Sequence, residues 1–273
     1  NAYAPALRNV GFDFQQVTTD DEYAATFMAA PEYVRDNLAA TKEVLRRYAP
    51  DHAIEIHITE YGPLVYPFRP GSATDKTSDM AWNRNLAGAL YLASLFHLFA
   101  EEPLITSANH MPLYQGGFGA LVGLEWHPTL RKFWRNAVYP VFQTYAGLAG
   151  SEVLRVTVEG PTFDALAGGF VPALPSVTLL DAAALRSADG ALTLTLVNRS
   201  IGGSATATMD APKGTHFSSA KLLTADDYHA ENSVRSPDTV AFKTFPIHQI
   251  LSREPLTVRL PKHSLTAVRF ERR

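Results

Sequence analysis

The sequence predicts a mixed α/β region, residues 1–150, followed by an all-β region, residues 151–273. Before Gly150, stretches with a helical period of apolar residues alternate with short runs of β-branched residues, as in parallel βα units. After it, short segments of alternating apolar and polar residues recur between Gly, Pro, Asn and Asp, which is typical of an antiparallel sandwich or jelly roll.

The composition excludes several classes of function. The 273 residues are 46% apolar and 19% charged, which is ordinary for a globular protein, and the formal charge is -3. Because no long basic run occurs, we expect no nucleic-acid partner. The longest apolar stretch, residues 86–100, is shorter than the roughly 20 residues of a membrane span, so no membrane partner is expected either. The N-terminus lacks the pattern of a signal peptide and indicates a start within a longer protein, which leaves a cytoplasmic or a secreted location open.

We expect no metal and no other cofactor. The chain has no cysteine, and its nine histidines do not follow the spacing of metal ligands. Thiolate catalysis and disulfides are excluded as well.

The first predicted helix has two possible start signals. Thr19 and Glu22 have the spacing of a capping box, and Pro31 is suited to the first turn of a helix. Apolar residues then follow a 3.6-residue period, which predicts a helix of about 17 residues from Pro31 to Pro50. The predicted apolar face consists of Val34, Leu38, Val44, Leu45 and Tyr48.

A strand, a helix and a second strand follow, which predicts a parallel βα unit. The strands are predicted at residues 54–59 and 104–108, and the helix ends near Ala100 after a cap at Ser78 or Asp79. A loop rich in Pro and Gly, residues 62–78, is long enough to suggest a functional cover. After a glycine-rich loop, residues 115–123, a further helix is predicted at 130–148 and ends at Gly150. The predicted strands of the all-β region are 153–158, 192–197, 205–209, 220–223, 240–242, 256–260 and 265–270.

Glu60 is the main catalytic candidate because it ends the first predicted strand, where barrel enzymes carry their chemistry. A solvated carboxylate is the alternative. Strict alternation would place Glu60 on the face of the strand isoleucines, so a twist or bulge is needed to redirect it. Glu55 and His57 would then face inward, either as a buried pair that supports Glu60 or as a hydrogen-bonded polar layer.

The sequence Thr59-Glu60-Tyr61-Gly62 resembles the nucleophile strand of retaining glycoside hydrolases with a (β/α)8 barrel. Three later segments, residues 192–200, 223–240 and 260–266, resemble in order and spacing the C-terminal domain of family 51 α-L-arabinofuranosidases. A Tyr-Pro-Val-Phe helix at 139–142 adds to this resemblance. Family 51 typically has Asp-Glu-Trp-Asn at the nucleophile, so the substrate is less certain than the reaction type.

The resemblance implies the last two βα units of a (β/α)8 barrel followed by a β-sandwich. It assigns Glu60 as the nucleophile and Tyr3 as the tyrosine that hydrogen-bonds it, although Tyr3 could equally be a frayed terminal residue. The family's acid/base glutamate follows an asparagine, and Asn-Glu does not occur in this chain. We therefore expect the isolated chain to be inactive, and to need the missing N-terminal barrel portion or another chain. A homo-oligomer is a separate expectation.

Further candidate ligands of a sugar lie near the same strand ends. Asn109 and His110 follow the second strand, where a barrel places groups that bind sugar hydroxyls, although such a pair also caps loops. Trp82 and Trp126 could stack on a sugar face, but large aromatic residues more often belong to the core. Tyr61 could pack or contact substrate.

The sequence thus predicts a retaining glycoside hydrolase that acts on terminal α-L-arabinofuranosyl residues of polysaccharides or oligosaccharides. Two alternatives stay open. The chain could belong to a related endo-glucanase or β-glycosidase, or it could be a non-catalytic carbohydrate-binding or structural module.

Overall fold

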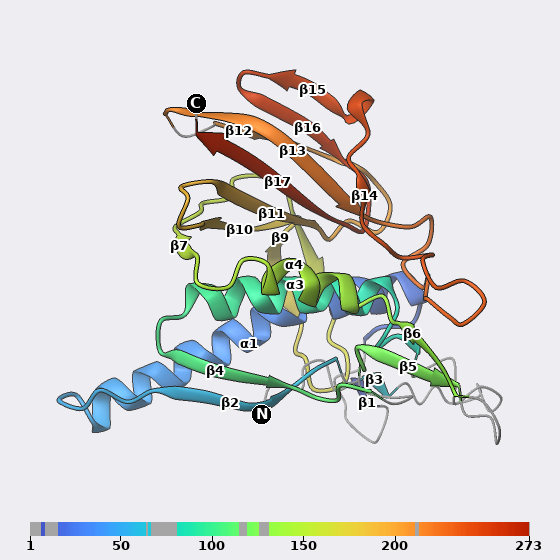
Figure 1. Cartoon of the computed structure of the whole chain (residues 1–273). Coiled ribbons are helices and arrows are strands. Elements are labelled where there is room, and N and C mark those ends of the chain that lie inside the picture. Colours follow the sequence, from blue (N-terminus) through green and yellow to red (C-terminus); the bar gives the residue numbers. More distant parts are fainter. Residues whose placement is uncertain are drawn as a thin grey trace.

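The computed structural model describes residues 7–8, 16–63, 65–66, 81–114, 119–125, 131–210 and 213–272. In Figure 1 a layer of helices lies between a pair of parallel strands on one side and antiparallel sheets on the other. This arrangement confirms the predicted order of a mixed α/β region followed by antiparallel sheets. None of the helices in the described ranges is long and apolar enough to cross a membrane.

Helix α1 (Asp20–Tyr48) is 29 residues long and begins at the capping box, not at Pro31. The Thr19 side chain accepts a hydrogen bond from the Glu22 N–H, and the Glu22 carboxylate accepts one from the Thr19 N–H. The predicted start at Pro31 is wrong because the turns before it bury Phe27 and its neighbours completely, and this packing outweighs the backbone hydrogen bond that Pro31 removes.

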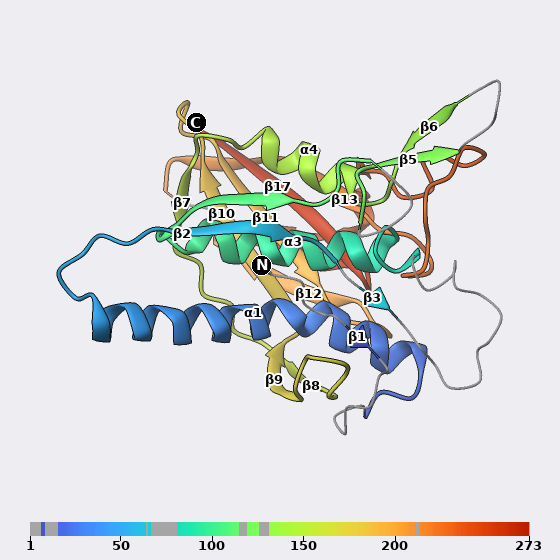
Figure 2. The same ribbon diagram turned by 90° about the horizontal axis from the view of Figure 1, so that it is seen from below.

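Strands β2 (Ile56–Tyr61) and β4 (Ile105–His110) pair in parallel, as predicted. The helix between them, α3 (Leu86–Glu101), is capped by Asn85, whose side chain accepts a hydrogen bond from the Gly88 N–H at 3.0 Å. The predicted cap at Ser78 or Asp79 is therefore wrong, and most of the predicted covering loop, residues 62–78, lies outside the described residues. Seen from below in Figure 2, β2 and β4 run side by side along α3.

The predicted helix at residues 130–148 is wrong over its first half. Strands β5 (Val122–Glu125) and β6 (Lys132–Arg135) form an antiparallel pair, and helix α4 (Tyr139–Ala146) is short. Trp134 lies so close to Gly123 that a Cβ there would meet the indole ring at 2.1 Å, so this side-chain packing fixes the pair of strands. Pro140 stands in the first turn of α4, and Gly147, not Gly150, is its C-cap. A short parallel pair joins β1 (Leu7–Arg8) to β3 (Val65–Tyr66).

The all-β region forms a six-stranded sheet in the order β14-β13-β17-β11-β10-β7 and a three-stranded sheet in the order β12-β16-β15. Strands β12 and β16 have the predicted bounds, whereas β8, β9, β10 and β15 were not predicted and residues 240–242 are not a strand. Strand β10 was missed because its central alanines do not show the β-branched pattern of a strand. The strands are β7 (Glu152–Leu154), β8 (Thr162–Ala165), β9 (Leu174–Thr178), β10 (Leu180–Arg186), β11 (Leu192–Asn198), β12 (Ala205–Met209), β13 (Thr215–Leu223), β14 (Lys243–Thr244), β15 (Ile250–Arg253), β16 (Leu256–Leu260) and β17 (Ser264–Arg272), with a short 3-10 helix at Ile247–Gln249.

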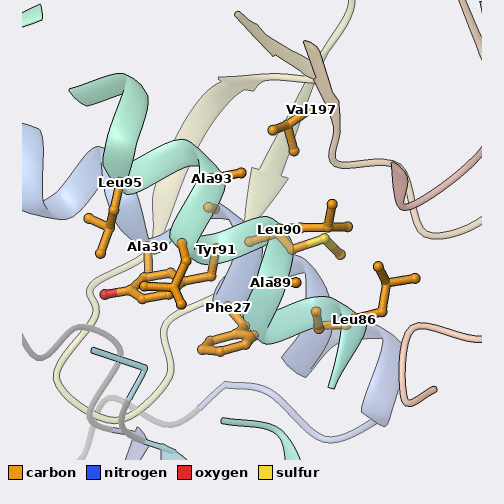
Figure 3. Packing of buried hydrophobic residues seen from close by; sticks show 14 of the residues in the cluster. Phe27, Ala30, Leu86, Ala89, Leu90, Tyr91, Ala93, Leu95 and Val197 are labelled. Atoms are coloured by element: carbon orange, nitrogen blue, oxygen red, sulfur yellow. The ribbon is translucent and has the colours of Figure 1, made fainter. Parts of the chain in front are cut away.

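Two hydrophobic cores hold these layers together. The first lies between α1, α3 and the six-stranded sheet, where Phe27, Leu90 and Tyr91 share a cluster with Val197 of β11 (Figure 3). The second lies between the two antiparallel sheets and includes Val258 of β16. Because the helices use one face of the six-stranded sheet as part of their own core, the α/β and all-β regions pack as continuous layers.

Candidate functional site

The carboxyl ends of β2 and β4 meet at one edge. Tyr61 is paired with His110, and the Met111 N–H donates a hydrogen bond to the Tyr61 carbonyl at 3.0 Å. Glu60 directly precedes Tyr61, and Asn109 directly precedes His110. Both are therefore brought to the same end of the parallel sheet. This is the end at which α/β proteins place ligands.

Glu60 lies in an irregular segment of β2. Ile58 pairs with Ala108 and Tyr61 with His110, so β2 has one more residue than β4 between the two pairs. Ile58 and Tyr61 are both buried, at 6% and 3% exposure, whereas Glu60 is half-buried. Such an extra residue is a β-bulge, which changes the direction of the side chains beside it. The bulge that the sequence required at Glu60 is thus present, and this carboxyl group is not enclosed with the buried residues on either side of it.

Glu55 and His57 form the expected pair, with His57 Nε2 at 3.5 Å from the Glu55 carboxylate. Residues of β4 complete this cluster: Thr106 donates to Glu55 at 3.1 Å, and Ser107 Oγ lies 2.8 Å from His57 Nδ1. The prediction of a buried pair is wrong for the described chain, because the side chains of Glu55 and His57 are 61% and 56% exposed. They lie on the face of the parallel pair that the helices do not cover.

Tyr61 and His110 pack beneath the strand ends. The ring of Tyr61 lies edge-on to Phe99 at 5.2 Å, and the ring of His110 lies 4.7 Å from Phe142. His110 Nε2 is also 2.9 Å from the Gly119 carbonyl, so the imidazole connects the end of β4 to residue 119. Burial lowers the pKa of His110 and raises that of Tyr61. For Tyr61 the structure supports a packing role over a substrate contact. A sugar contact by His110 stays a prediction, and the packing of its ring does not favour it.

Trp82 is a core residue, and its predicted role as a sugar platform is wrong. It is 7% exposed, with the rings of Tyr23, Tyr228 and His229 at centroid distances of 5.0, 5.7 and 4.7 Å. At this exposure the indole ring is not open to a ligand. The other predicted aromatic ligands, Tyr3 and Trp126, lie outside the described residues.

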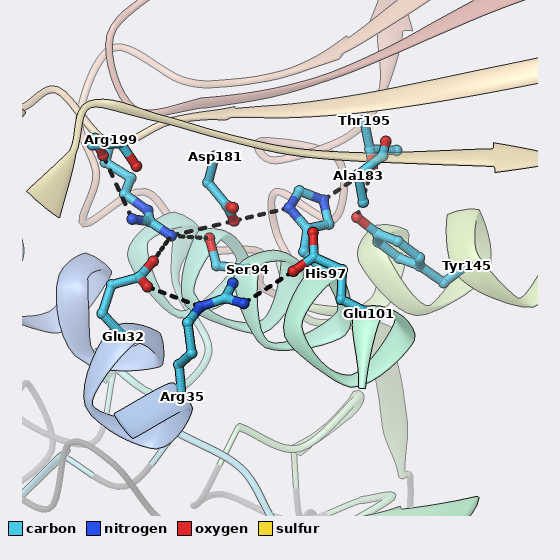
Figure 4. A network of polar contacts seen from close by, with 11 residues as sticks. Glu32, Arg35, Ser94, His97, Glu101, Tyr145, Asp181, Ala183, Thr195 and Arg199 are labelled. Carbon is cyan, nitrogen blue, oxygen red and sulfur yellow. Dashed lines mark hydrogen bonds and ion pairs between the residues drawn. The ribbon is translucent and has the colours of Figure 1, made fainter. Parts of the chain in front are cut away.

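A buried polar network between the helices and the six-stranded sheet was not predicted (Figure 4). Arg199, only 1% exposed, lies 2.8 Å from the Glu32 carboxylate and 3.3 Å from that of Asp181. His97 is fully buried, and its Nδ1 lies 2.8 Å from Asp181. Burial acts to raise the pKa of Asp181, but the interactions of its carboxylate with His97 and Arg199 outweigh burial and hold the pKa well below its usual range. The available signal was an arginine at the end of an apolar strand, in Asn198-Arg199-Ser200.

No group of three or more metal-binding side chains occurs among the described residues.

Residues 126–264 match the sequence profile of the α-L-arabinofuranosidase C-terminal domain. Among solved structures, the chain is similar to a GH51 arabinofuranosidase from Xanthomonas axonopodis pv. citri, with a TM-score of 0.74 and 19% identity over 94% of this chain and 49% of that one. An α-L-arabinofuranosidase from Thermotoga maritima in complex with arabinose gives 0.71 and 16%, over 92% and 50%. A family 51 α-L-arabinofuranosidase from Bifidobacterium longum gives 0.72 and 20%, over 91% and 48%.

The chain thus spans about half the length of the structures it matches. The mixed α/β region and the antiparallel sheets correspond to the C-terminal half of those proteins. Comparison with curated protein sequences finds no match.

Proposed function

Since the chain belongs to the family of the α-L-arabinofuranosidase C-terminal domain, we propose that it is the C-terminal half of a retaining enzyme that releases terminal α-L-arabinofuranosyl residues from polysaccharides or oligosaccharides. The observation that carries this proposal is Glu60, half-buried in a bulge at the carboxyl end of a parallel strand. A carboxylate at this end of a βα unit is where a barrel hydrolase needs its nucleophile.

In this proposal β2, α3 and β4 belong to the last two βα units of a (β/α)8 barrel. Helices cover one face of the strand pair, and the other face carries the exposed cluster of Glu55, His57, Thr106 and Ser107. A polar face that is uncovered when two of eight strands are present is suited to become an inward layer when the other strands close around it. The N-terminal portion of the barrel, outside this chain, would supply them.

The Glu60 carboxylate attacks the anomeric carbon, and the bond from that carbon to the leaving oxygen breaks. An acid from the N-terminal half, roughly 5 Å away, gives its proton to the leaving oxygen, and then takes one from the water that hydrolyses the glycosyl-enzyme. Asn109, exposed beside Glu60 at the end of β4, is placed to bind a sugar hydroxyl. Tyr61 and His110 hold the strand ends from behind.

The test uses the completed protein, in which the N-terminal barrel portion is joined to this chain. We expect Glu60→Gln to lower kcat/KM on a chromogenic arabinofuranoside by at least about 10³-fold, because the covalent step is lost. Glu159→Gln, which changes an exposed carboxylate of the all-β region, is the matched control and should keep full activity. In Glu60→Ala, azide can enter the space left by the carboxylate, and we expect it to restore turnover and to give a glycosyl azide of inverted configuration.

The alternatives give different results in the same assays. Turnover of β-glucans or β-glucosides in place of the arabinofuranoside would indicate the related endo-glucanase or β-glycosidase. Sugar binding with no turnover in the unmutated completed protein would indicate a carbohydrate-binding module. Hydrolysis by the isolated chain at the rate of an intact relative would contradict the proposal that the acid lies outside it.

A further inference from the structure

A buried network connects the all-β region to the helices that support the candidate nucleophile (Figure 4). Arg199, directly after β11, and Asp181 of β10 come from the six-stranded sheet, whereas Glu32 comes from α1, and Ser94 and His97 from α3. Arg199 and His97 are essentially inaccessible to solvent. Charge-assisted hydrogen bonds in such a site are strong, and they fix the distance and angle between the layers that they join.

Thr195 of β11 extends this network to α4. Its Oγ lies 2.9 Å from His97 Nε2 and accepts a hydrogen bond from the Tyr145 hydroxyl at 3.2 Å. The Tyr145 side chain extends from α4 toward Thr195 (Figure 4), and its ring packs edge-on against Phe96 of α3. One side chain therefore has its hydroxyl in the polar network and its ring in an aromatic layer.

The aromatic layer extends from Tyr145 to the two strand ends. The ring of Phe96 lies 5.0 Å from Tyr145, 4.9 Å from Phe142 and 6.1 Å from Tyr61. Phe142 in turn contacts His110 at 4.7 Å. Tyr61 is the residue that follows Glu60, so a series of direct contacts leads from the β-sandwich to the bulge that carries the candidate nucleophile.

From this arrangement we infer that Tyr145 is a positioning residue: through Phe96 and Tyr61 it transmits the placement of the six-stranded sheet to Glu60. The inference rests on the proposed function. Because close-packed rings cannot be compressed, a shift of the Tyr145 ring displaces Phe96 and then Tyr61. A nucleophile must lie within about 0.5 Å of its productive position, so a small displacement at Tyr61 lowers the rate of attack. Substrate binding, which depends on other groups, is affected less.

The experiment compares two variants of the completed protein that each lose one buried hydroxyl. Tyr145→Phe keeps the ring but removes its hydrogen bond to Thr195. Ser264→Ala removes the bond from a buried hydroxyl of β17 to the Pro261 carbonyl, at 2.7 Å, away from the aromatic layer. Rates are divided by the concentration of active sites, measured with a covalent inhibitor, and are recorded well below both melting temperatures.

We expect Tyr145→Phe to lower kcat about five- to tenfold with KM within twofold, and Ser264→Ala to leave both constants within twofold. Phe96→Leu, which breaks the aromatic contacts but leaves the hydrogen bonds intact, should lower kcat by a similar factor, and adding Tyr145→Phe to it should bring little further loss. Equal kcat values for Tyr145→Phe and Ser264→Ala, with Glu60 still essential, would overturn the inference alone. If Glu60→Gln is fully active, it is the proposed function that fails.

Discussion

Each side of the helix layer carries a pair formed by a histidine and a carboxylate, and one pair is buried whereas the other is exposed. Toward the six-stranded sheet, His97 and Asp181 form a pair at 2.8 Å whose side chains are 0% and 10% exposed. Toward the parallel strands, His57 and Glu55 form a pair at 3.5 Å whose side chains are 56% and 61% exposed. The first pair is enclosed because the six-stranded sheet covers it, and the second is open because, in the described part of the chain, its sheet consists of two strands.

This difference separates what stabilises the chain from what it is proposed to do. Buried charges need every partner in place, because an uncompensated charge in a nonpolar interior is very costly. Exposed charges contribute little to stability, and solvent or a further layer of protein can replace their partners. On the side that faces the sandwich, the buried charges therefore find their partners within this chain. On the side of the parallel strands, where Glu60 lies, the exposed polar groups can be covered by further protein.

The largest effect is expected on the enclosed side, for Arg199→Met. The change removes the positive charge that contacts Asp181 and Glu32 and leaves two carboxylates without it. We expect the free energy of unfolding to fall by about 3–5 kcal/mol. Urea denaturation followed by tryptophan fluorescence measures this loss.

Arg186→Met is the control for this prediction. Arg186 pairs with Glu152 at the sheet edge, where the two side chains are 47% and 59% exposed. Its loss should cost less than about 1 kcal/mol. Equal losses in the two variants would mean that the Arg199 network adds nothing beyond a surface pair, and the contrast between the two sides would disappear.

The sequence predicted local features of the chain better than contacts between distant residues. The capping box of Thr19 and Glu22 and the bounds of β12 and β16 depend on neighbouring residues and their periodicity. The network depends on contacts between residues 84 and 167 positions apart, as for His97 with Asp181 and Glu32 with Arg199. Such partners cannot be paired from a single sequence, because an arginine after an apolar strand does not indicate which distant carboxylates it contacts.

The candidate site shows the same limit. Glu60 was found from its position at a strand end and from the Thr-Glu-Tyr-Gly motif, and the need for a bulge followed from alternation. Which face of each strand is covered could not be predicted, because it depends on chain that packs from elsewhere. For that reason Glu55 and His57, expected to face inward, are exposed, and Trp82, considered both as a sugar platform and as a core residue, belongs to the core.

A smaller effect is expected from protonation of His110, which makes the free energy of unfolding depend on pH. Burial lowers the pKa of His110 in the folded chain, whereas in the unfolded chain it has its usual value of about 6.5. As the pH falls below ~6.5, the unfolded chain therefore binds more protons than the folded chain. The contribution of His110 to stability is complete above pH ~6.5 and is lost as the pH falls toward the pKa of the folded state. One proton can change the unfolding free energy by at most about 1.4 kcal/mol per pH unit.

The measurement is the unfolding free energy of the chain and of His110→Gln between pH 7.5 and 5. The unfolding free energy of the variant should fall less steeply as the pH falls. The pH dependence that remains in the variant includes the contribution of His263, whose pKa is also lowered by burial. An identical slope in the two proteins would show that His110 takes up its proton as readily in the folded chain, and hence that the strand ends are open to water.

The smallest effect is expected on the open side, for Glu55→Gln in the isolated chain. The amide can still accept the hydrogen bond from Thr106, and only the interaction with His57 is lost, so the unfolding free energy should change by less than about 1 kcal/mol and the change should shrink further in high salt. In the completed protein, where other strands are proposed to cover this face, the same substitution should change stability more and respond less to salt, because covered charges are screened less. The difference between the two measurements thus reports whether the open face becomes an interior. A change as large as that of Arg199→Met in the isolated chain would show that Glu55 is already enclosed, and no covering half would then be required.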